Sequence, residues 1–152
     1  MLLDSTVLTK EKTKEIAKLV GQSYSIWDSL RLKGIGSTKL NIDSYSEDFK
    51  GFLKQDNNNN CCNIELRPNG IIVHLNKRAT RYSWAIPFYK LSLFYSNDYS
   101  IHADGRFLRI RKDDLAQKSR SFINKILEQK ARKSKINPLW FVLLNKCHQI
   151  NL

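Results

Sequence analysis

The fold class is clearest in residues 71–112, which read IIVHLNKRATRYSWAIPFYKLSLFYSNDYSIHADGRFLRIRK. Short runs of alternating apolar and polar residues are separated by residues typical of tight turns. The strongest turn signal is Asp104-Gly105, a pair that favours a two-residue hairpin connection. Strands joined by such short turns pair antiparallel, because parallel strands need long crossover connections.

Together with the stretch before the turn Pro68-Asn69-Gly70, these residues predict six strands. The strands are Asn63–Arg67, Ile71–Asn76, Arg81–Phe88, Lys90–Ser96, Tyr99–Ala103 and Arg106–Lys112. Alternation places the aromatic residues Tyr82, Trp84 and Phe88 on one face of the third strand. We expect them, together with Tyr95 of the fourth strand, to belong to the core, where large apolar side chains usually lie. We interpret residues 61–112 as one antiparallel β meander.

Helical patterns flank the meander on both sides. Thr9 caps a predicted helix from Lys10 to about Val20, with Gly21 as its stop, and Ser23–Leu32 has helical spacing. Lys39–Asp43 alternates like a short strand, but residues 1–55 are otherwise predicted as a helical N-terminal extension, and Asp56–Asn60 as a loop.

After the meander, Asp113 or Asp114 caps a predicted amphipathic helix over residues 113–136. An apolar tail follows in residues 137–152. The whole chain, 1–152, is therefore expected to be a single α+β domain, a size that suffices for one hydrophobic core.

Residues 81–127, RYSWAIPFYKLSLFYSNDYSIHADGRFLRIRKDDLAQKSRSFINKIL, carry a family resemblance. A meander that is closed by an amphipathic C-terminal helix resembles the pleckstrin-homology-like (PH-like) superfold, and small bacterial PH-like proteins are similar to residues 61–136. The resemblance implies seven strands, so Lys39–Asp43 is expected to supply the seventh. It also implies a domain that binds phosphoinositides, peptides or partner proteins.

The charge is strongly positive and regional. The chain has 26 Lys and Arg against 14 Asp and Glu, a net charge of +12, and residues 76–146 alone account for +11 of it. Such a field attracts polyanions. The alternative is a solvated helix face in a lysine-rich chain.

We expect the basic residues of the last strand and the closing helix to form the binding surface. The predicted residues are Arg81, Arg106, Phe107, Arg109, Arg111, Lys118, Lys125 and Arg132. The expected partner is an acidic protein or an anionic membrane surface. The second interpretation is non-specific binding of nucleic acid, with Phe107 stacking on a base.

The sequence indicates a non-enzymatic protein without a metal or cofactor. It contains no nucleophile elbow, Walker loop, dinucleotide fingerprint or HExxH motif. Cys61-Cys62 has no CxxC partner, and Cys147-His148 is a single adjacent pair. An enzyme hypothesis would require His74 and His102 to line one pocket together with an acid.

The tail contains the longest apolar run, whose predicted contact residues are Leu139, Trp140, Phe141 and Leu143. Three uses stay open for it: docking within the chain, a homodimer contact, or an interfacial membrane segment. The run is too short to span a bilayer. The sparse cysteines and the lack of a signal-peptide pattern predict a cytoplasmic protein.

Overall fold

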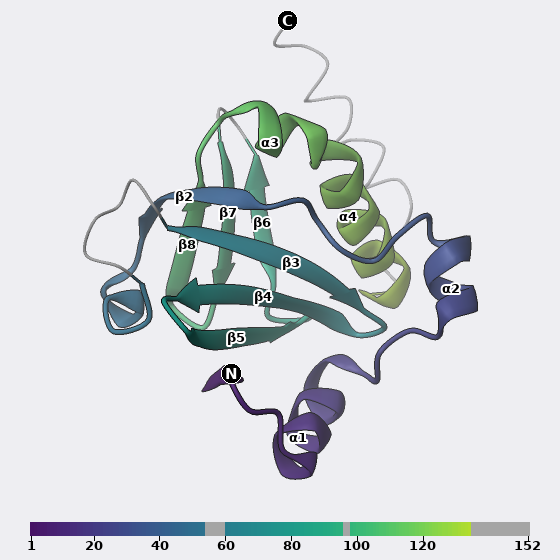
Figure 1. The fold of residues 1–152 in the computed structure, drawn as a ribbon. Helices are drawn as coiled ribbons and strands as arrows, with labels where there is room; N and C mark the ends of the chain where they lie inside the picture. Colours follow the sequence, from purple (N-terminus) through teal and green to yellow (C-terminus); the bar gives the residue numbers. More distant parts are fainter. Residues whose placement is uncertain (54–59, 96–97, 135–152) are drawn as a thin grey trace, which may run out of the picture.

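The computed structural model describes residues 1–53, 60–95 and 98–134 (Figure 1). The described residues form an α+β fold. Its elements in chain order are β1 (Leu2–Asp4), α1 (Lys10–Val20), α2 (Ile26–Arg31), β2 (Leu40–Tyr45), the 3-10 turn η1 (Glu47–Phe49), β3 (Cys61–Arg67), β4 (Gly70–Lys77), β5 (Thr80–Pro87), β6 (Ser92–Tyr95), β7 (Tyr99–Ala103), β8 (Arg106–Ile110), α3 (Asp114–Lys118) and α4 (Arg120–Ser134).

Within these described residues the strands make one open antiparallel sheet of eight, in the order β1-β5-β4-β3-β2-β8-β7-β6. The prediction of a single meander is therefore wrong in one respect. Two meanders, β3–β5 and β6–β8, lie on either side of β2, and β5 does not pair with β6. The link Phe88–Leu91 carries the chain between them, and both its end residues are buried. In Figure 1 strands β6–β8 run across the direction of β3–β5.

The predicted strands are confirmed, and the segment Lys39–Asp43 falls in β2, which bends at a register shift between Ile42 and Ser44. The helices expected within residues 1–55 are α1 and α2. The described part of this segment is more than a helical extension, however, because it also contains β2, inside the sheet, and β1, which pairs with β5. Strand β1 was missed because three residues are too few to show a period.

One hydrophobic cluster joins the two meanders and the C-terminal helices. It contains Trp84 and Ile86 from β5, Leu108 from β8 and Ile123 from α4. The rings of Trp84 and Phe49 meet edge to face, with 5.0 Å between centroids. The prediction that the aromatic set belongs to the core is confirmed for Trp84 and Phe88, and Tyr82 packs against that core. It is wrong for Tyr95, which is 37% exposed.

A second, smaller cluster lies on the opposite face of the sheet, under α1. Ile16 and Val20 of the helix pack there against Ile72 of β4 and Ala85 of β5. The bounds and caps of α1 agree with the prediction: Thr9 Oγ1 accepts from the Lys12 amide, and Gly21 has a φ of 86°. Strand β4 is covered on both faces, which explains its nearly continuous apolar sequence.

The predicted helix over 113–136 is two helices, because the chain turns at Ser119. The Ser119 hydroxyl is buried and lies 2.6 Å from Thr38 Oγ1, at the start of the central strand. Asp113 is the residue that caps α3, by accepting from the Ala116 amide. The buried residues Phe122, Ile123 and Ile126 form the expected apolar face. Across the described ranges, no helix is both long and apolar enough to cross a membrane.

Candidate functional site

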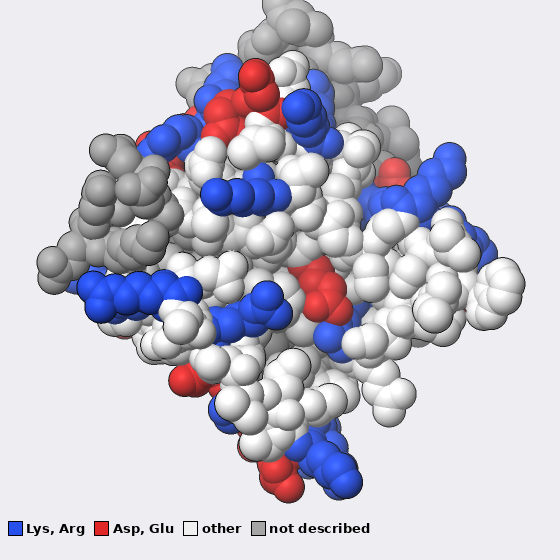
Figure 2. Space-filling view, viewed as in Figure 1, with Lys and Arg blue, Asp and Glu red and all other residues white. Residues whose placement is uncertain are grey.

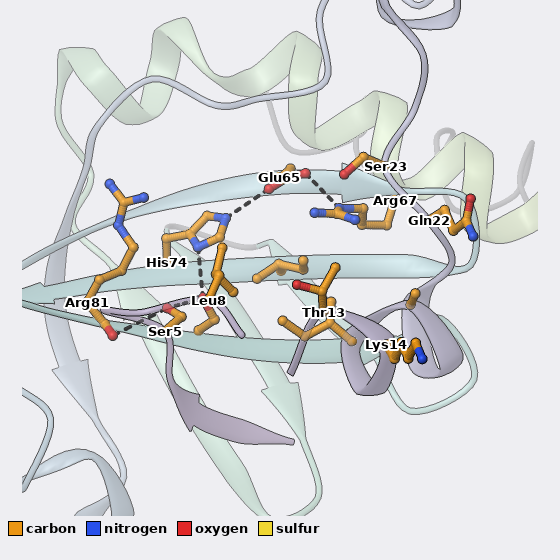
Figure 3. A pocket seen from close by; sticks show the side chains of 14 residues that line it. Ser5, Leu8, Thr13, Lys14, Gln22, Ser23, Glu65, Arg67, His74 and Arg81 are labelled. Carbon is orange, nitrogen blue, oxygen red and sulfur yellow. Dashed lines mark hydrogen bonds and ion pairs between the residues drawn. The ribbon is translucent and has the colours of Figure 1, made fainter. Parts of the chain in front are cut away.

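A cavity lies between α1 and the face of β3–β5 that α1 covers (Figure 3). Its volume is about 550 Å³. The polar side chains that line it come from four elements and the segment after β1, and the principal ones are Ser5, Lys14, Glu65, Arg67, His74, Ser83 and Arg81. Leu8, Ile16, Ala17 and Ile72 supply apolar walls.

A chain of hydrogen bonds crosses the floor of this cavity. Glu65 Oε2 lies 3.0 Å from His74 Nε2, and His74 Nδ1 lies 3.0 Å from Ser83 Oγ. Ser83 Oγ in turn lies 2.7 Å from Ser5 Oγ. The chain ties β3, β4 and β5 to the segment after β1. These hydrogen bonds form because the register of β3, β4 and β5 places Glu65, His74 and Ser83 next to one another on the face of the sheet that α1 covers.

The order Ser83–His74–Glu65 is that of a nucleophile, a base and an orienting acid. Ser83, however, is only 2% exposed, and its Oγ is already engaged with Ser5. A substrate carbonyl cannot reach that oxygen in this arrangement. The contacts of the three side chains are therefore those of a partly buried polar network that links neighbouring strands.

Arg67 forms the second contact of Glu65. Arg67 Nε lies 2.6 Å from Glu65 Oε1 as an ion pair, but its N–H is not aligned for a hydrogen bond, and this buried nitrogen has no hydrogen-bond partner among the described residues. Burial opposes the ionisation of Glu65, but the hydrogen bond with His74 and the charge of Arg67 outweigh it, so the pKa of Glu65 is below its ordinary value.

Sequence reasoning missed this cavity. Alternation places Glu65 and Arg67 on the polar face of one predicted strand and His74 on the polar face of the next. Nothing in the sequence shows that α1 covers this face. The signal that could have indicated the cavity is the oppositely charged pair Glu65 and Arg67, two residues apart on β3 and therefore on one face. The next strand, β4, is almost entirely apolar. Arg81, which was predicted to bind a partner, lies at one end of the cavity.

The predicted basic residues do not gather on one surface. Arg81 lies on β5, and three strands separate it from the β8 residues Arg106, Phe107 and Arg109. Lys118 lies on α3, before the turn at Ser119, whereas Lys125 and Arg132 lie on α4, and Arg111 follows β8. Figure 2 shows Lys and Arg side chains spread over the visible face, with Asp and Glu among them.

Two of these cations have partners within the chain. Arg106 Nε lies 3.1 Å from Asp48 Oδ2. Lys125 Nζ donates to the backbone carbonyls of Lys33, at 3.2 Å, and Gly34, at 2.7 Å, where the segment after α2 passes α4. Lys125 therefore holds α2 in place as well as adding charge beside it.

An aromatic strip crosses the outer face of β6–β8. Phe94 on β6, which is 59% exposed, meets His102 on β7 edge to face, with 5.0 Å between centroids. His102 stacks on Phe107 of β8 at 5.7 Å. The exposed Arg109 follows on the same strand; burial and the charge of Arg109 lower the pKa of His102. Phe107 and Arg109 lie two residues apart on β8, on either side of the buried Leu108.

Helix α2 is the most exposed apolar feature of the described chain. Ile26 is 79% exposed, Trp27 82% and Leu30 66%, and no residue of this six-residue helix is buried. Figures 1 and 2 show α2 at the edge of the molecule, with uncharged atoms outward and Lys and Arg atoms nearby. We call Ile26, Trp27 and Leu30 the apolar tip.

The remaining chemical candidates stay apart. His102 lies on β7 and does not line the cavity that contains His74. Over the described ranges, no three His, Cys, Asp or Glu side chains are grouped as metal ligands. Cys147, His148 and the predicted contact residues Leu139, Trp140, Phe141 and Leu143 lie outside the described residues.

Comparison with known proteins found no matching family model, curated protein or solved structure.

Proposed function

We propose that this protein is a non-enzymatic PH-like binding module that attaches to an anionic membrane surface through the apolar tip of α2 and the cations around it. The observation that carries the proposal is the exposure of Ile26, Trp27 and Leu30 beside Arg31, Lys33 and Lys125. The PH-like part rests on the sequence resemblance over residues 61–136.

The apolar tip is held in its exposed position from both ends. Residues 26, 27 and 30 fall within about a third of a helical turn of one another, so they face the same side. Tyr24 before the helix and Ile35 after it pack against the main core, and Lys125 binds the carbonyls that follow the helix. The helix therefore cannot rotate its apolar side inward without breaking these contacts.

The size of the tip favours a membrane over a protein partner. A stable protein interface buries about 800 Å² on each side, far more than three side chains supply. A lipid interface needs no such area: Trp is favoured at the headgroup boundary, and each Lys or Arg near an anionic surface adds about 1 kcal/mol. Arg31 and Lys33 are both exposed next to the tip, and Arg31 also forms an exposed ion pair with Asp28, at 3.2 Å.

The test is sedimentation with vesicles of phosphatidylcholine, with and without phosphatidylserine, at low and high salt. We expect binding only to the anionic vesicles, weakening as salt rises. The triple variant Ile26→Ser, Trp27→Ser, Leu30→Ser should lose binding and keep its fold, since none of the three residues is buried. The matched control is Tyr89→Ser, which removes another exposed aromatic residue, 80% exposed, far from α2 in sequence.

Fluorescence gives a second readout of the same contact. The difference between the spectra of the wild type and Trp27→Phe isolates the emission of Trp27 from that of the other two tryptophans, Trp84 and Trp140. That difference spectrum should shift to the blue when anionic vesicles are added. The membrane proposal would be wrong if the wild type did not bind anionic vesicles or if the triple variant still bound them. Binding of an acidic protein instead would favour a protein partner.

A second candidate function rests on the aromatic strip. Phe94, His102 and Phe107 lie side by side beside Arg109, which is the arrangement that single-stranded nucleic acid uses for stacking and phosphate contact. An oligonucleotide should then bind with a steep salt dependence, and Phe94→Ser with Arg109→Gln should weaken it at least tenfold. A flat salt response, or equal binding by the variant, would exclude this function.

A further inference from the structure

We propose that the cavity between α1 and β3–β5 binds a small organic anion, through a phosphate or carboxylate group that contacts Arg67. This site is separate from α2 and from the aromatic strip. It shares no residue with either surface, so the proposal stands or falls independently of the proposed function.

The cavity has the size and lining of a ligand site. Its volume of about 550 Å³ lies within the range of about 300–1,000 Å³ that is common for small-molecule pockets. The apolar walls, Ile16, Ala17 and Ile72, are fixed by the packing of α1 on the sheet. Leu8 is 60% exposed and lines the same cavity, so the apolar part of a ligand could cover it.

The charge of the lining favours an anion. Lys14, Arg67 and Arg81 carry positive charge, whereas Glu65 is the one carboxylate among the described lining residues. Glu65 is already compensated on both oxygens, by Arg67 and by His74. The charged side chains of the lining, three cations and one carboxylate, therefore carry a net charge of +2 for a ligand to neutralise.

Arg67 marks where the anionic group would lie. Its side chain is only 14% exposed, and its Nε lies 2.6 Å from Glu65 Oε1 without the alignment of a good hydrogen bond. A buried guanidinium whose donors are incompletely satisfied is costly, and a bound oxygen anion beside it would lower that cost. Figure 3 shows the Arg67 guanidinium beside Glu65 within the cavity, with Lys14 and Arg81 toward its ends.

The polar floor adds a rigid support. Ser5, Ser83, His74 and Glu65 hold one another in place, so the cavity keeps its shape without a ligand. The hydroxyl of Ser83 cannot attack a ligand, because it is buried and bonded to Ser5. The site is therefore assigned to binding, with no covalent step.

The experiment is an NMR titration of the amide signals of the full chain with three probes of similar size. Phenyl phosphate and benzoate carry the two anionic groups, and benzyl alcohol is the neutral control. We expect saturable shifts at Thr13, Lys14, Arg67 and His74 with at least one anion, and none with the alcohol. Which anion binds more tightly distinguishes a phosphate ligand from a carboxylate ligand.

Three variants locate the binding. Lys14→Gln with Arg81→Gln removes two exposed cations and should weaken binding about three- to tenfold. Lys18→Gln is the matched control, because it lies one turn further along α1 and does not line the cavity. Thr13→Phe should abolish binding, because it fills the cavity from an exposed position while every charge is kept.

The decisive variant replaces the ion pair as a unit, Glu65→Gln with Arg67→Gln. It leaves no unpaired buried charge, and thermal unfolding should show that it still folds. Binding should fall at least tenfold. Absence of saturable shifts in the wild type would overturn the proposal, and so would equal binding by the folded double variant or by Thr13→Phe.

Discussion

Gly70 and Ile86 lie so close together that a β-carbon on Gly70 would be 2.2 Å from the carbonyl oxygen of Ile86. The same β-carbon would also lie 2.8 Å from the Cα of Pro87 and from a methyl group of Val20. Gly70 is thus a point of close approach between β4, β5 and α1. The sequence predicted this glycine as part of the turn Pro68-Asn69-Gly70, whereas the structure requires it for space.

Replacing Gly70 by Ala should therefore destabilise the protein by about 2–4 kcal/mol, because a backbone atom cannot yield as a flexible side chain would. Urea unfolding measures this loss. Gly51→Ala is the control: no described atom lies within 4 Å of its added β-carbon, so its stability should match or slightly exceed the wild type. Similar stability of the two variants would contradict the close approach.

Asp113 should contribute more to stability than its neighbour Asp114. Its two carboxylate oxygens accept from the Ala116 amide at 2.9 Å and from Asn41 Nδ2 at 2.8 Å, so it caps α3 and ties it to β2. Asp113→Ala should cost about 1–2 kcal/mol, whereas Asp114→Ala should cost less than about 0.5 kcal/mol. Thermal or urea unfolding of the two variants compares their stabilities directly. Equal losses of unfolding free energy would show that Asp113 contributes no more than Asp114.

Local signals predicted the elements well. Thr9 and Gly21 gave both ends of α1, because a cap bond and a left-handed glycine are short-range requirements. Asp104 and Gly105 both have positive φ, at 51° and 76°, as the predicted hairpin turn requires. Such features depend on a few neighbouring residues, so the sequence alone carries them.

Long-range arrangement could not be predicted in the same way. The connection Phe88–Leu91 reads like a hairpin turn, yet it carries the chain from one meander to the other. The cavity could not be predicted for the same reason. Glu65, His74 and Ser83 come together through the register of three strands, and α1 closes over them only because Ile72 and Ala85 face it. No residue pattern within one element indicates either event.

Cys61 and Cys62 should differ sharply in reactivity, although they are adjacent in β3. Burial raises the pKa of the Cys62 thiol to about 12, whereas Cys61 faces the other side of the strand and is partly exposed. Because the thiolate is the reactive form, iodoacetamide should modify Cys61 at least tenfold faster under native conditions. Peptide mass spectrometry locates the label. In urea both should react, and native labelling of Cys62 at the rate of Cys61 would contradict its burial.

Glu65 should make the stability of the protein depend on pH in the acid range. Its pKa in the folded protein lies below its ordinary value near 4.5, because His74 and Arg67 together outweigh the burial that opposes its ionisation. A carboxyl group with a lowered pKa stabilises the folded state above its unfolded pKa, and this stabilisation is lost as pH falls through the folded pKa.

The variant Glu65→Gln has no such ionisation, but its amide oxygen can still accept from His74. The wild type should therefore have a larger free energy of unfolding than Glu65→Gln, and this difference should be largest near pH 6. The difference should become smaller as the pH falls below about 4.5. Urea unfolding of both proteins between neutral and acid pH measures the gap. Parallel curves would mean that Arg67 and His74 do not favour the ionised carboxylate, which would also weaken the case for a charged, pre-formed cavity floor.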